Sequence, residues 1–253
     1  MFYLIGIGLK PGHLTIEARE AIAKCSRVFL DTYTSAYAEG SIEELKEIAG
    51  KDILPLDRKG IEEDFALMLK EAKASDEDVS LLVFGNALSA TTHVQLLLDA
   101  KKIGLKAIVL PGISIFDFVG STGLDQYRFG RACTIVAPKE NYSPESFYAV
   151  IESNFNAGMH SFCLLDIDAE KNYKMTVAEA LSILAKIEKK QGKNVLQKAT
   201  LVGLYALGSN KQMVMSGDLE KMQRSSFALF PQSLVIAVSL TDKEKEALSD
   251  LNG

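Results

Sequence analysis

The chain has 253 residues, of which 47% are hydrophobic and 24% charged, as in an ordinary globular protein. Its formal net charge of −5 argues against general nucleic-acid binding, because such binding depends on Lys and Arg that neutralise phosphates. No apolar run approaches the ~18 residues that a membrane span needs, and the first residues resemble a strand more than a signal peptide.

Apolar segments alternate with amphipathic helical segments in the first 110 residues. This pattern is typical of an α/β fold whose parallel sheet is covered on both faces. Thr15 is placed to cap the first helix, and Ser41 with Glu44 forms a capping box before the second. The pattern predicts strands at 2–9, 27–30, 79–84 and 106–110, and helices at 16–24, 41–49, 62–74 and 91–102.

The rhythm changes after Pro111 and Gly112, and we place a domain boundary there. We expect two α/β domains, 1–112 and 113–253, with a ligand cleft between them. Two short, closely spaced strands predict a hairpin, and hence a mixed sheet in the second domain. The predicted strands there are 132–137, 161–165, 200–205, 212–215 and 233–238, and the predicted helices are 114–119, 144–155, 177–190, 218–222 and 242–251.

The three cysteines, Cys25, Cys133 and Cys163, are widely spaced and lie among apolar residues. An odd number in such surroundings predicts reduced core thiols in a cytoplasmic protein. No Cys and His positions have the spacing of a metal site, so we expect no bound metal.

The first segment that could bind a ligand runs from Gly6 to Gly12, at the end of the first strand. Glycines there let the backbone approach a ligand closely, and Asp31 ends the second strand where a Rossmann fold has its ribose-binding acid. A dinucleotide fingerprint needs a third glycine at position 11, however, and Pro11 stands there. The spacing disfavours NAD and leaves two alternatives, another ligand or a tight turn without ligand contact.

Polar side chains also follow the predicted strands at 79–84 and 106–110, where open α/β sheets bind ligands. Asn86 and Ser89 follow the first of these strands, and Ser114 follows the second. The alternative is that such residues only begin the next helices, as Thr91 or Thr92 and Ser114 could. His93 is more typical of a structural hydrogen-bonding residue than of a catalyst.

Three acids, Asp166, Asp168 and Glu170, follow the predicted strand at 161–165. Carboxylates there could hold a cationic substrate or accept a proton, or they could simply be solvated. The chain has no Gly-x-Ser-x-Gly elbow and no Walker loop. The residues alone therefore indicate an α/β protein with a small-molecule cleft and leave its function open.

Taken together, these segments resemble the tetrapyrrole-methylase superfamily, and within it the diphthine synthase family. The superfamily signature is matched by GIGLKPGHLT at 6–15. The stretches that resemble the diphthine synthases are LDTYTS at 30–35, ATTH at 90–93, STGLDQYRFG at 121–130 and LLDI at 164–167.

The resemblance implies a homodimer of two α/β domains that binds S-adenosylmethionine in the cleft between them and releases S-adenosylhomocysteine. It implies repeated methylation of an amino group, that of the 3-amino-3-carboxypropyl histidine on translation elongation factor 2. No catalytic base is implied. The cofactor contacts that it implies are Leu9, Asn86, Ser89, Ser114, Ile115, Leu165, Leu207 and Ser233.

The chain departs from the family pattern at two of these positions. Asn86 and Ala87 stand where the family usually has Asp-Pro, and Ser233 stands where a histidine is frequent. Asparagine keeps an acceptor oxygen but loses the charge that attracts a sulfonium, and Asp166 is a candidate to compensate.

We expect the protein substrate to be recognised around residues 31–35 and 121–131. Arg128 and Arg131 are candidates to hold its carboxylate, since a guanidinium matches that group bidentately. Ordinary surface charges are the alternative for both arginines. Other functions left open are methylation of a tetrapyrrole or another small molecule, and a non-catalytic nucleotide-binding domain.

Overall fold

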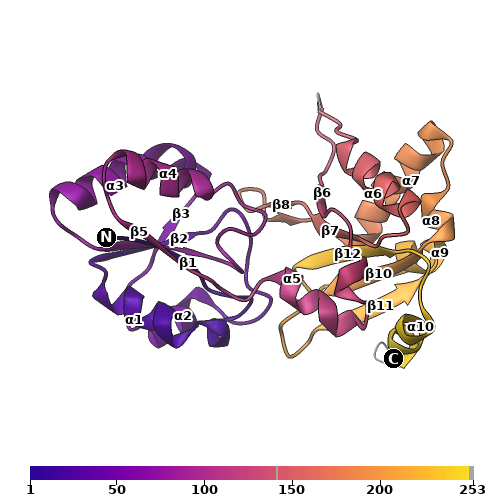
Figure 1. The fold of residues 1–253 in the computed structure, drawn as a ribbon, viewed down its shortest axis with the longest axis horizontal. Coiled ribbons are helices and arrows are strands. Elements are labelled where there is room, and N and C mark those ends of the chain that lie inside the picture. The colour runs from indigo at the N-terminus through magenta and orange to yellow at the C-terminus, as the bar shows by residue number, and fades with distance from the viewer. Residues whose placement is uncertain (141, 251–253) are drawn as a thin grey trace. The chain divides into compact units, whose positions relative to one another are not determined.

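The computed structural model describes residues 1–140 and 142–250. The chain forms two compact units, each with its own sheet (Figure 1). The N-terminal unit holds Met1–Asp117 and the short segment Ala169–Lys171. The C-terminal unit holds Phe118–Asp168 and the chain from Asn172 onward. The domain boundary near residue 112 stays a prediction.

The sheet of the N-terminal unit is entirely parallel, in agreement with the predicted parallel sheet. Its strands follow the order β3-β2-β4-β1-β5, so that β1 lies between β4 and β5. Because all the strands run in one direction, their carboxyl ends meet at a single edge, which we call the carboxyl edge. The strands are β1 (Phe2–Gly6), β2 (Arg27–Asp31), β3 (Leu54–Leu56), β4 (Val79–Val83) and β5 (Ala107–Leu110).

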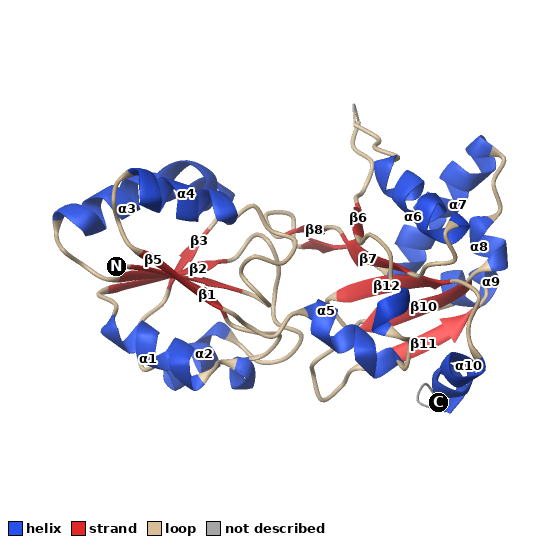
Figure 2. Cartoon of the chain, viewed as in Figure 1, coloured by secondary structure: helices blue, strands red, loops and turns tan. Residues whose placement is uncertain are grey.

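Helices cover both faces of this sheet (Figure 2). Helices α1 (Ile16–Lys24) and α2 (Ile42–Ala49) pack on one face, where Tyr3 and Ile5 of β1 point. Helices α3 (Phe65–Ala74) and α4 (Val94–Lys102) pack on the other face, against Phe2 and Leu4. Strand β1 is therefore apolar at successive positions because side chains on both its faces are buried.

The helix ends show which local predictions hold. Thr15 Oγ1 accepts a hydrogen bond from Ala18 N (3.0 Å), and the capping box of Ser41 with Glu44 is present. The prediction that Thr91 or Thr92 begins the next helix is wrong, because α4 begins after His93. Strand β3 was not predicted, since it has three residues, contains Pro55 and lies at the edge of the sheet.

The C-terminal unit has a mixed sheet in the order β11-β10-β12-β7-β6. Strands β6 and β7 are parallel and the other pairs antiparallel, and β10 with β11 forms the predicted hairpin. The predicted mixed sheet is confirmed. The strands are β6 (Cys133–Ile135), β7 (Ser161–Leu165), β10 (Thr200–Tyr205), β11 (Met213–Gly217) and β12 (Gln232–Ala237).

A single apolar core joins this sheet to its helices through residues such as Tyr148, Leu184 and Met222. Two further strands, β8 (Ile167–Asp168) and β9 (Tyr173–Lys174), form a separate antiparallel pair. The remaining helices are α5 (Ile115–Phe118), α6 (Ser146–Asn156), α7 (Val177–Gln191), α8 (Val195–Lys198), α9 (Leu219–Arg224) and α10 (Asp242–Asp250). Within the described ranges, no helix is long and apolar enough to cross a membrane.

Candidate functional site

Five predicted cofactor residues lie at the carboxyl edge of the N-terminal unit. Leu9 follows β1, Asn86 and Ser89 follow β4, and Ser114 with Ile115 follows β5. The strand order places β4, β1 and β5 side by side, so the loops that carry these residues are neighbours. This is the end of a parallel sheet at which α/β proteins bind ligands.

Glycines join these three loops by direct backbone contact. A Cβ on Gly6 would lie 2.6 Å from Gly112 N and 2.7 Å from Gly85 O, which is closer than real Cβ contacts. Gly8 and Gly85 exchange two backbone hydrogen bonds of 3.0 and 2.8 Å, and both have φ near +70° (+73° and +72°). The close approach at Gly6 leaves no room for a side chain, and the positive φ of Gly8 and Gly85 favours glycine. These glycines pack against each other and so hold the loops together.

The loop after β1 is fixed through its backbone. Leu9 N donates to His13 Nδ1 (3.3 Å), and Leu9 O accepts from Ala38 N (2.9 Å). Burial, helped by the positive charge of Lys10, lowers the pKa of His13. A lowered pKa keeps the ring neutral, as an acceptor of the Leu9 N–H must be. The half-buried Leu9 side chain is thus presented from a rigid loop.

The loop after β4 is a turn built on Asn86. Its Oδ1 accepts from Leu88 N (3.1 Å), and its carbonyl accepts from Ser89 N (3.1 Å). Thr91 Oγ1 donates to Ala87 O (2.6 Å) and closes the turn. Both Asn86 and Ser89 are half-buried. Asn86 therefore supports its own loop through one oxygen and keeps its amide N–H groups for another partner.

The loop after β5 begins a helical turn at Ser114, as predicted. Ser114 N donates to Asp117 Oδ2 (2.7 Å), and Ser114 Oγ accepts from Phe116 N (3.3 Å). Ser114 is buried. Its hydroxyl proton is not used in these bonds, so the side chain can still donate to a ligand.

A buried pair, Asp31 and His93, joins the end of β2 to the start of α4. His93 Nε2 lies 3.0 Å from Asp31 Oδ2, at ion-pair distance but outside hydrogen-bond alignment. Neither ring nitrogen has a hydrogen-bond partner among the described residues. Asp31 also accepts from Tyr33 N, Thr34 N and Thr34 Oγ1 at 3.0, 3.1 and 2.7 Å. The carboxylate thus holds the turn that begins the predicted recognition segment 31–35.

The sequence shows both residues of this pair at strand or helix ends but does not show their contact. Each residue drew attention separately, Asp31 at the end of β2 and His93 after β4, but their contact depends on β2 lying beside β4. The same carboxylate raises the pKa of Tyr33 to about 12, after the larger effect of burial and together with Glu62. The Tyr33 hydroxyl therefore stays protonated and donates to Glu62 Oε1 (3.3 Å).

The other three predicted cofactor residues lie at one end of the sheet in the C-terminal unit. Ser233, at the start of β12, is opposite Leu164 of β7 and Leu204 of β10. Leu165 ends β7, and Leu207 follows the end of β10. All three are buried. The fold of the C-terminal unit therefore brings these three residues to the same end of its sheet, although they are far apart in the sequence.

Asp166 follows Leu165 and has a defined role in the fold. Its Oδ2 accepts from Ala137 N (3.0 Å), and its backbone N donates to Ile135 O (3.0 Å). The carboxylate therefore joins the ends of β6 and β7. Compensation by Asp166 for the charge missing at Asn86 stays a prediction.

Arg128 is bound within the C-terminal unit. Its guanidinium pairs with the buried carboxylate of Glu244 and donates to Val238 O (3.2 Å) and Ser239 O (2.8 Å). Arg131 differs, because its side chain is exposed while its backbone exchanges hydrogen bonds with Asn154. The role of both arginines in substrate binding stays a prediction, and the contacts of Arg128 give that residue a structural task.

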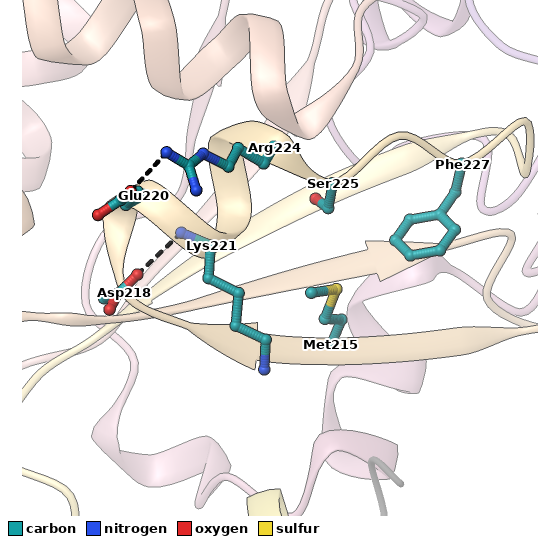
Figure 3. A pocket seen from close by; sticks show the side chains of 7 residues that line it. All are labelled: Met215, Asp218, Glu220, Lys221, Arg224, Ser225 and Phe227. Carbon is teal, nitrogen blue, oxygen red and sulfur yellow. Dashed lines mark hydrogen bonds and ion pairs between the residues drawn. The ribbon is translucent and has the colours of Figure 1, made fainter.

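A pocket of about 510 Å³ opens beside α9 (Figure 3). Its charged side chains are engaged locally, because Lys221 Nζ donates to Ser216 O (2.9 Å) and Arg224 pairs with Glu220 (2.6 Å). Met215 and Phe227 supply apolar lining. None of the predicted site residues lines it. No group of His, Cys, Asp or Glu suited to a metal ion occurs in the part of the chain that the structure describes.

Comparison with known proteins identifies the class. The family model of tetrapyrrole (corrin/porphyrin) methylases matches residues 1–223. The chain therefore belongs to this family of methylases.

Similarity to individual proteins shows to which group within this family the chain belongs. The chain is 35% identical to a diphthine synthase of Methanococcus aeolicus over 99% of its own length and 98% of that protein. It is 33% identical to one of Methanocaldococcus jannaschii, with the same coverage. A crystal structure of diphthine synthase matches with a TM-score of 0.87 and 28% identity, over 100% of this chain and 96% of that one. Within the methylases the chain belongs to the diphthine synthases, and the predicted resemblance is confirmed.

Proposed function

We propose that this protein is an S-adenosylmethionine-dependent methyltransferase of diphthamide biosynthesis. Its substrate is the 3-amino-3-carboxypropyl histidine of translation elongation factor 2, and repeated methylation of the amino group gives diphthine. The observation that carries the proposal is full-length similarity to diphthine synthases. The carboxyl edge of the N-terminal unit supports it, since polar groups of three neighbouring loops lie there.

The residues at this edge suit a sulfonium cofactor. The predicted contacts are amide, hydroxyl and leucine side chains, namely Asn86, Ser89, Ser114 and Leu9, and they carry no charge. Such a set suits a ligand with a nucleoside, an amino acid and a single cationic sulfur. A pyrophosphate would instead need N–H groups that Pro11 cannot supply. We propose that Leu165, Leu207 and Ser233 of the C-terminal unit complete the cofactor contacts.

The chain contributes mainly orientation. When bound, S-adenosylmethionine supplies an already activated methyl group. The protein then has to align the amine with that methyl and exclude water, and alignment alone can remove about 7–11 kcal/mol from a barrier. The glycine contact between Gly6, Gly85 and Gly112 serves this purpose, because it fixes three loops against each other. The amine must be neutral when it reacts, which a less polar environment favours.

We further propose a cytoplasmic homodimer with no membrane or nucleic-acid partner. Helix α4 exposes Val94 and Leu98, which are 55% and 48% accessible and lie one turn apart on the same side. Leu67 of α3 is 59% accessible. We propose that these exposed apolar side chains are buried in the homodimer.

The decisive experiment is incubation with methyl-labelled S-adenosylmethionine and elongation factor 2 carrying the aminocarboxypropyl histidine. We expect label on that residue and none on the unmodified factor. Label on a tetrapyrrole, or cofactor binding without transfer, would replace the proposal with one of its alternatives.

Calorimetry tests the cofactor residues separately. S-adenosylhomocysteine should bind and NAD should not. Leu9→Arg places a positive charge and bulk beside the sulfonium and should abolish binding, whereas Leu54→Arg, at an exposed leucine at the start of the edge strand β3, is the control. Asn86→Asp should retain or tighten binding. Normal binding by Leu9→Arg would exclude the loop after β1 from the site.

A further inference from the structure

Two cysteines face each other across the parallel pair β6 and β7. Cys133 and Cys163 are register partners, and their sulfurs lie 3.7 Å apart. Neighbouring strands are about 4.7–4.9 Å apart, which falls within the roughly 4.4–6.8 Å between Cα atoms that a disulfide spans. The two thiols can therefore join with a small movement of the side chains.

The two sulfurs differ in access. Cys163 is fully buried in the core of the C-terminal unit, whereas Cys133 is half-buried. Strand β6 is the edge strand of its sheet, so one side of it carries no neighbouring strand. Cys133 is therefore the more accessible of the two sulfurs.

The two sulfurs also differ in acidity. The hydrogen bond with Cys163 lowers the pKa of Cys133 although burial opposes this, and the positive charge of Arg131 lowers it further. The same hydrogen bond, together with burial, raises the pKa of Cys163. Because the thiolate is the nucleophile, Cys133 is the attacking residue and Cys163 the resolving one.

We propose that Cys133 and Cys163 form a reversible oxidation site that a small-molecule disulfide converts to an intramolecular disulfide. The Cys133 thiolate attacks one sulfur of the reagent, whose S–S bond breaks and releases one thiolate. The Cys163 thiol then loses its proton to solvent and attacks Cys133 Sγ, which breaks the mixed disulfide and releases the second thiolate. The two cysteines are oxidised, and the reagent is reduced to two thiols.

The new bond would join β6 and β7 two residues before Leu165. The same strands are joined beyond that point by Asp166 Oδ2 and Ala137 N. The oxidation site is defined by the thiols alone, and its test is independent of the methyltransferase assignment.

The test uses the intact protein and oxidised glutathione as the probe. The thiols titrated after denaturation should fall from the three of the reduced chain to one, with a mass loss of two hydrogen atoms. Non-reducing peptide mapping should link Cys133 to Cys163, and dithiothreitol should restore all the thiols. Cys25 is the internal control, since it is fully buried and its Sγ donates to Ala21 O (3.3 Å).

Single substitutions test the order of events. Cys163→Ser should accumulate a glutathione adduct on Cys133, Cys133→Ser should leave Cys163 unmodified, and Cys25→Ser should oxidise as the wild type does. Three titratable thiols after an exposure that oxidises dithiothreitol would overturn the proposal. So would a disulfide that includes Cys25, a link between two chains, or modification of Cys163 in the Cys133→Ser protein.

Discussion

Each unit contains one buried histidine that lies 3.0 Å from a buried carboxylate, and the two pairs differ in the hydrogen bonds that the histidine makes. In the C-terminal unit His160 Nε2 meets Glu244 Oε1, and in the N-terminal unit His93 Nε2 meets Asp31 Oδ2. All four side chains are almost completely inaccessible. The two pairs show that the same separation can belong to a closed structural network or to an incomplete one.

The pair in the C-terminal unit has its hydrogen bonds made. His160 Nδ1 accepts from Val238 N (3.0 Å), so the proton is on Nε2 and is donated to Glu244. Glu244 also accepts from Asp125 N (3.2 Å) and Thr241 N (2.8 Å) and pairs with Arg128. This network ties α10 to the segment that precedes β6.

The pair in the N-terminal unit leaves the histidine without a fixed tautomer. Neither nitrogen of His93 has an aligned partner among the described residues, so no contact decides which one carries the proton. Buried polar groups are normally satisfied, and an exception requires an explanation. His93 is such an exception, and its ring is held by burial and by the ion-pair distance to Asp31 Oδ2. Substitutions at Glu244 and Asp31, together with unfolding measured as a function of pH, test this difference between the two pairs.

Glu244→Gln should have the largest effect, a loss of about 3 kcal/mol in the free energy of unfolding at neutral pH. A glutamine must turn its NH₂ group toward either His160 Nε2–H or Arg128, and both are donors. Denaturant unfolding measures the loss. Glu246→Gln, at an exposed position on the same helix, is the control and should change little. Equal stability of the two variants would mean that the network contributes nothing.

The same carboxylate makes stability depend on pH. Burial alone would raise the pKa of Glu244, but hydrogen bonds from His160 and from Thr241 N and Asp125 N lower it to about 2. A depressed pKa stabilises the fold above about pH 4.5, and this contribution disappears as the pH falls toward 2. Unfolding between pH 5 and 3 should therefore lose less stability in Glu244→Gln than in the wild type. Parallel curves would contradict this assignment.

The strands show how much of the fold could be predicted from the sequence. Strands β7 and β10 were predicted at their observed bounds, because each is a clear apolar run between polar or helix-forming segments. Strand β3 and the β8–β9 pair were missed. They have three and two residues, and so short a run has no periodicity to detect.

The candidate site was predictable only one loop at a time. A strand end followed by Asn86 or Ser114 is visible in the sequence, but the order β4-β1-β5 that makes these loops neighbours arises from non-local pairing. For the same reason Gly6 was interpreted as a glycine for a ligand and Gly112 as a domain boundary, rather than as partners of each other. Neither histidine pair was predicted, since their members are 62 and 84 positions apart in sequence.

Asp31 should tolerate the substitution that Glu244 does not. In Asp31→Asn the remaining oxygen still accepts from Tyr33 N and Thr34 N. The new NH₂ faces Thr34 Oγ1 and His93 Nε2, and both of these groups can act as acceptors. We expect a loss below about 1 kcal/mol, against about 2 kcal/mol for Asp31→Ala, which removes the acceptors.

Kinetics should distinguish these two Asp31 variants further. Because Asp31→Ala releases the turn that holds Tyr33 and Thr34, we expect the KM for the modified elongation factor to rise about tenfold with little change in kcat. Asp31→Asn should stay near the wild type. A loss of 3 kcal/mol in Asp31→Asn would show that the N-terminal pair is as closed as its counterpart.

The smallest effect on stability is expected at Arg131, the arginine outside the closed network. Its side chain is exposed, and Asn154 holds its backbone whatever the side chain is. Arg131→Ala should therefore change the unfolding free energy by less than about 0.5 kcal/mol, whereas Arg128→Ala leaves Glu244 without its cation and should destabilise the C-terminal unit. Comparing the two arginine variants therefore separates an effect on substrate binding from an effect on folding.

If Arg131 holds the substrate carboxylate, its loss should slow methylation about tenfold, close to 1.4 kcal/mol in kcat/KM. Cofactor affinity should not change, and Arg224→Ala, at an exposed arginine on α9, should have no effect. Methylation at the wild-type rate by Arg131→Ala would place the carboxylate contact on another residue.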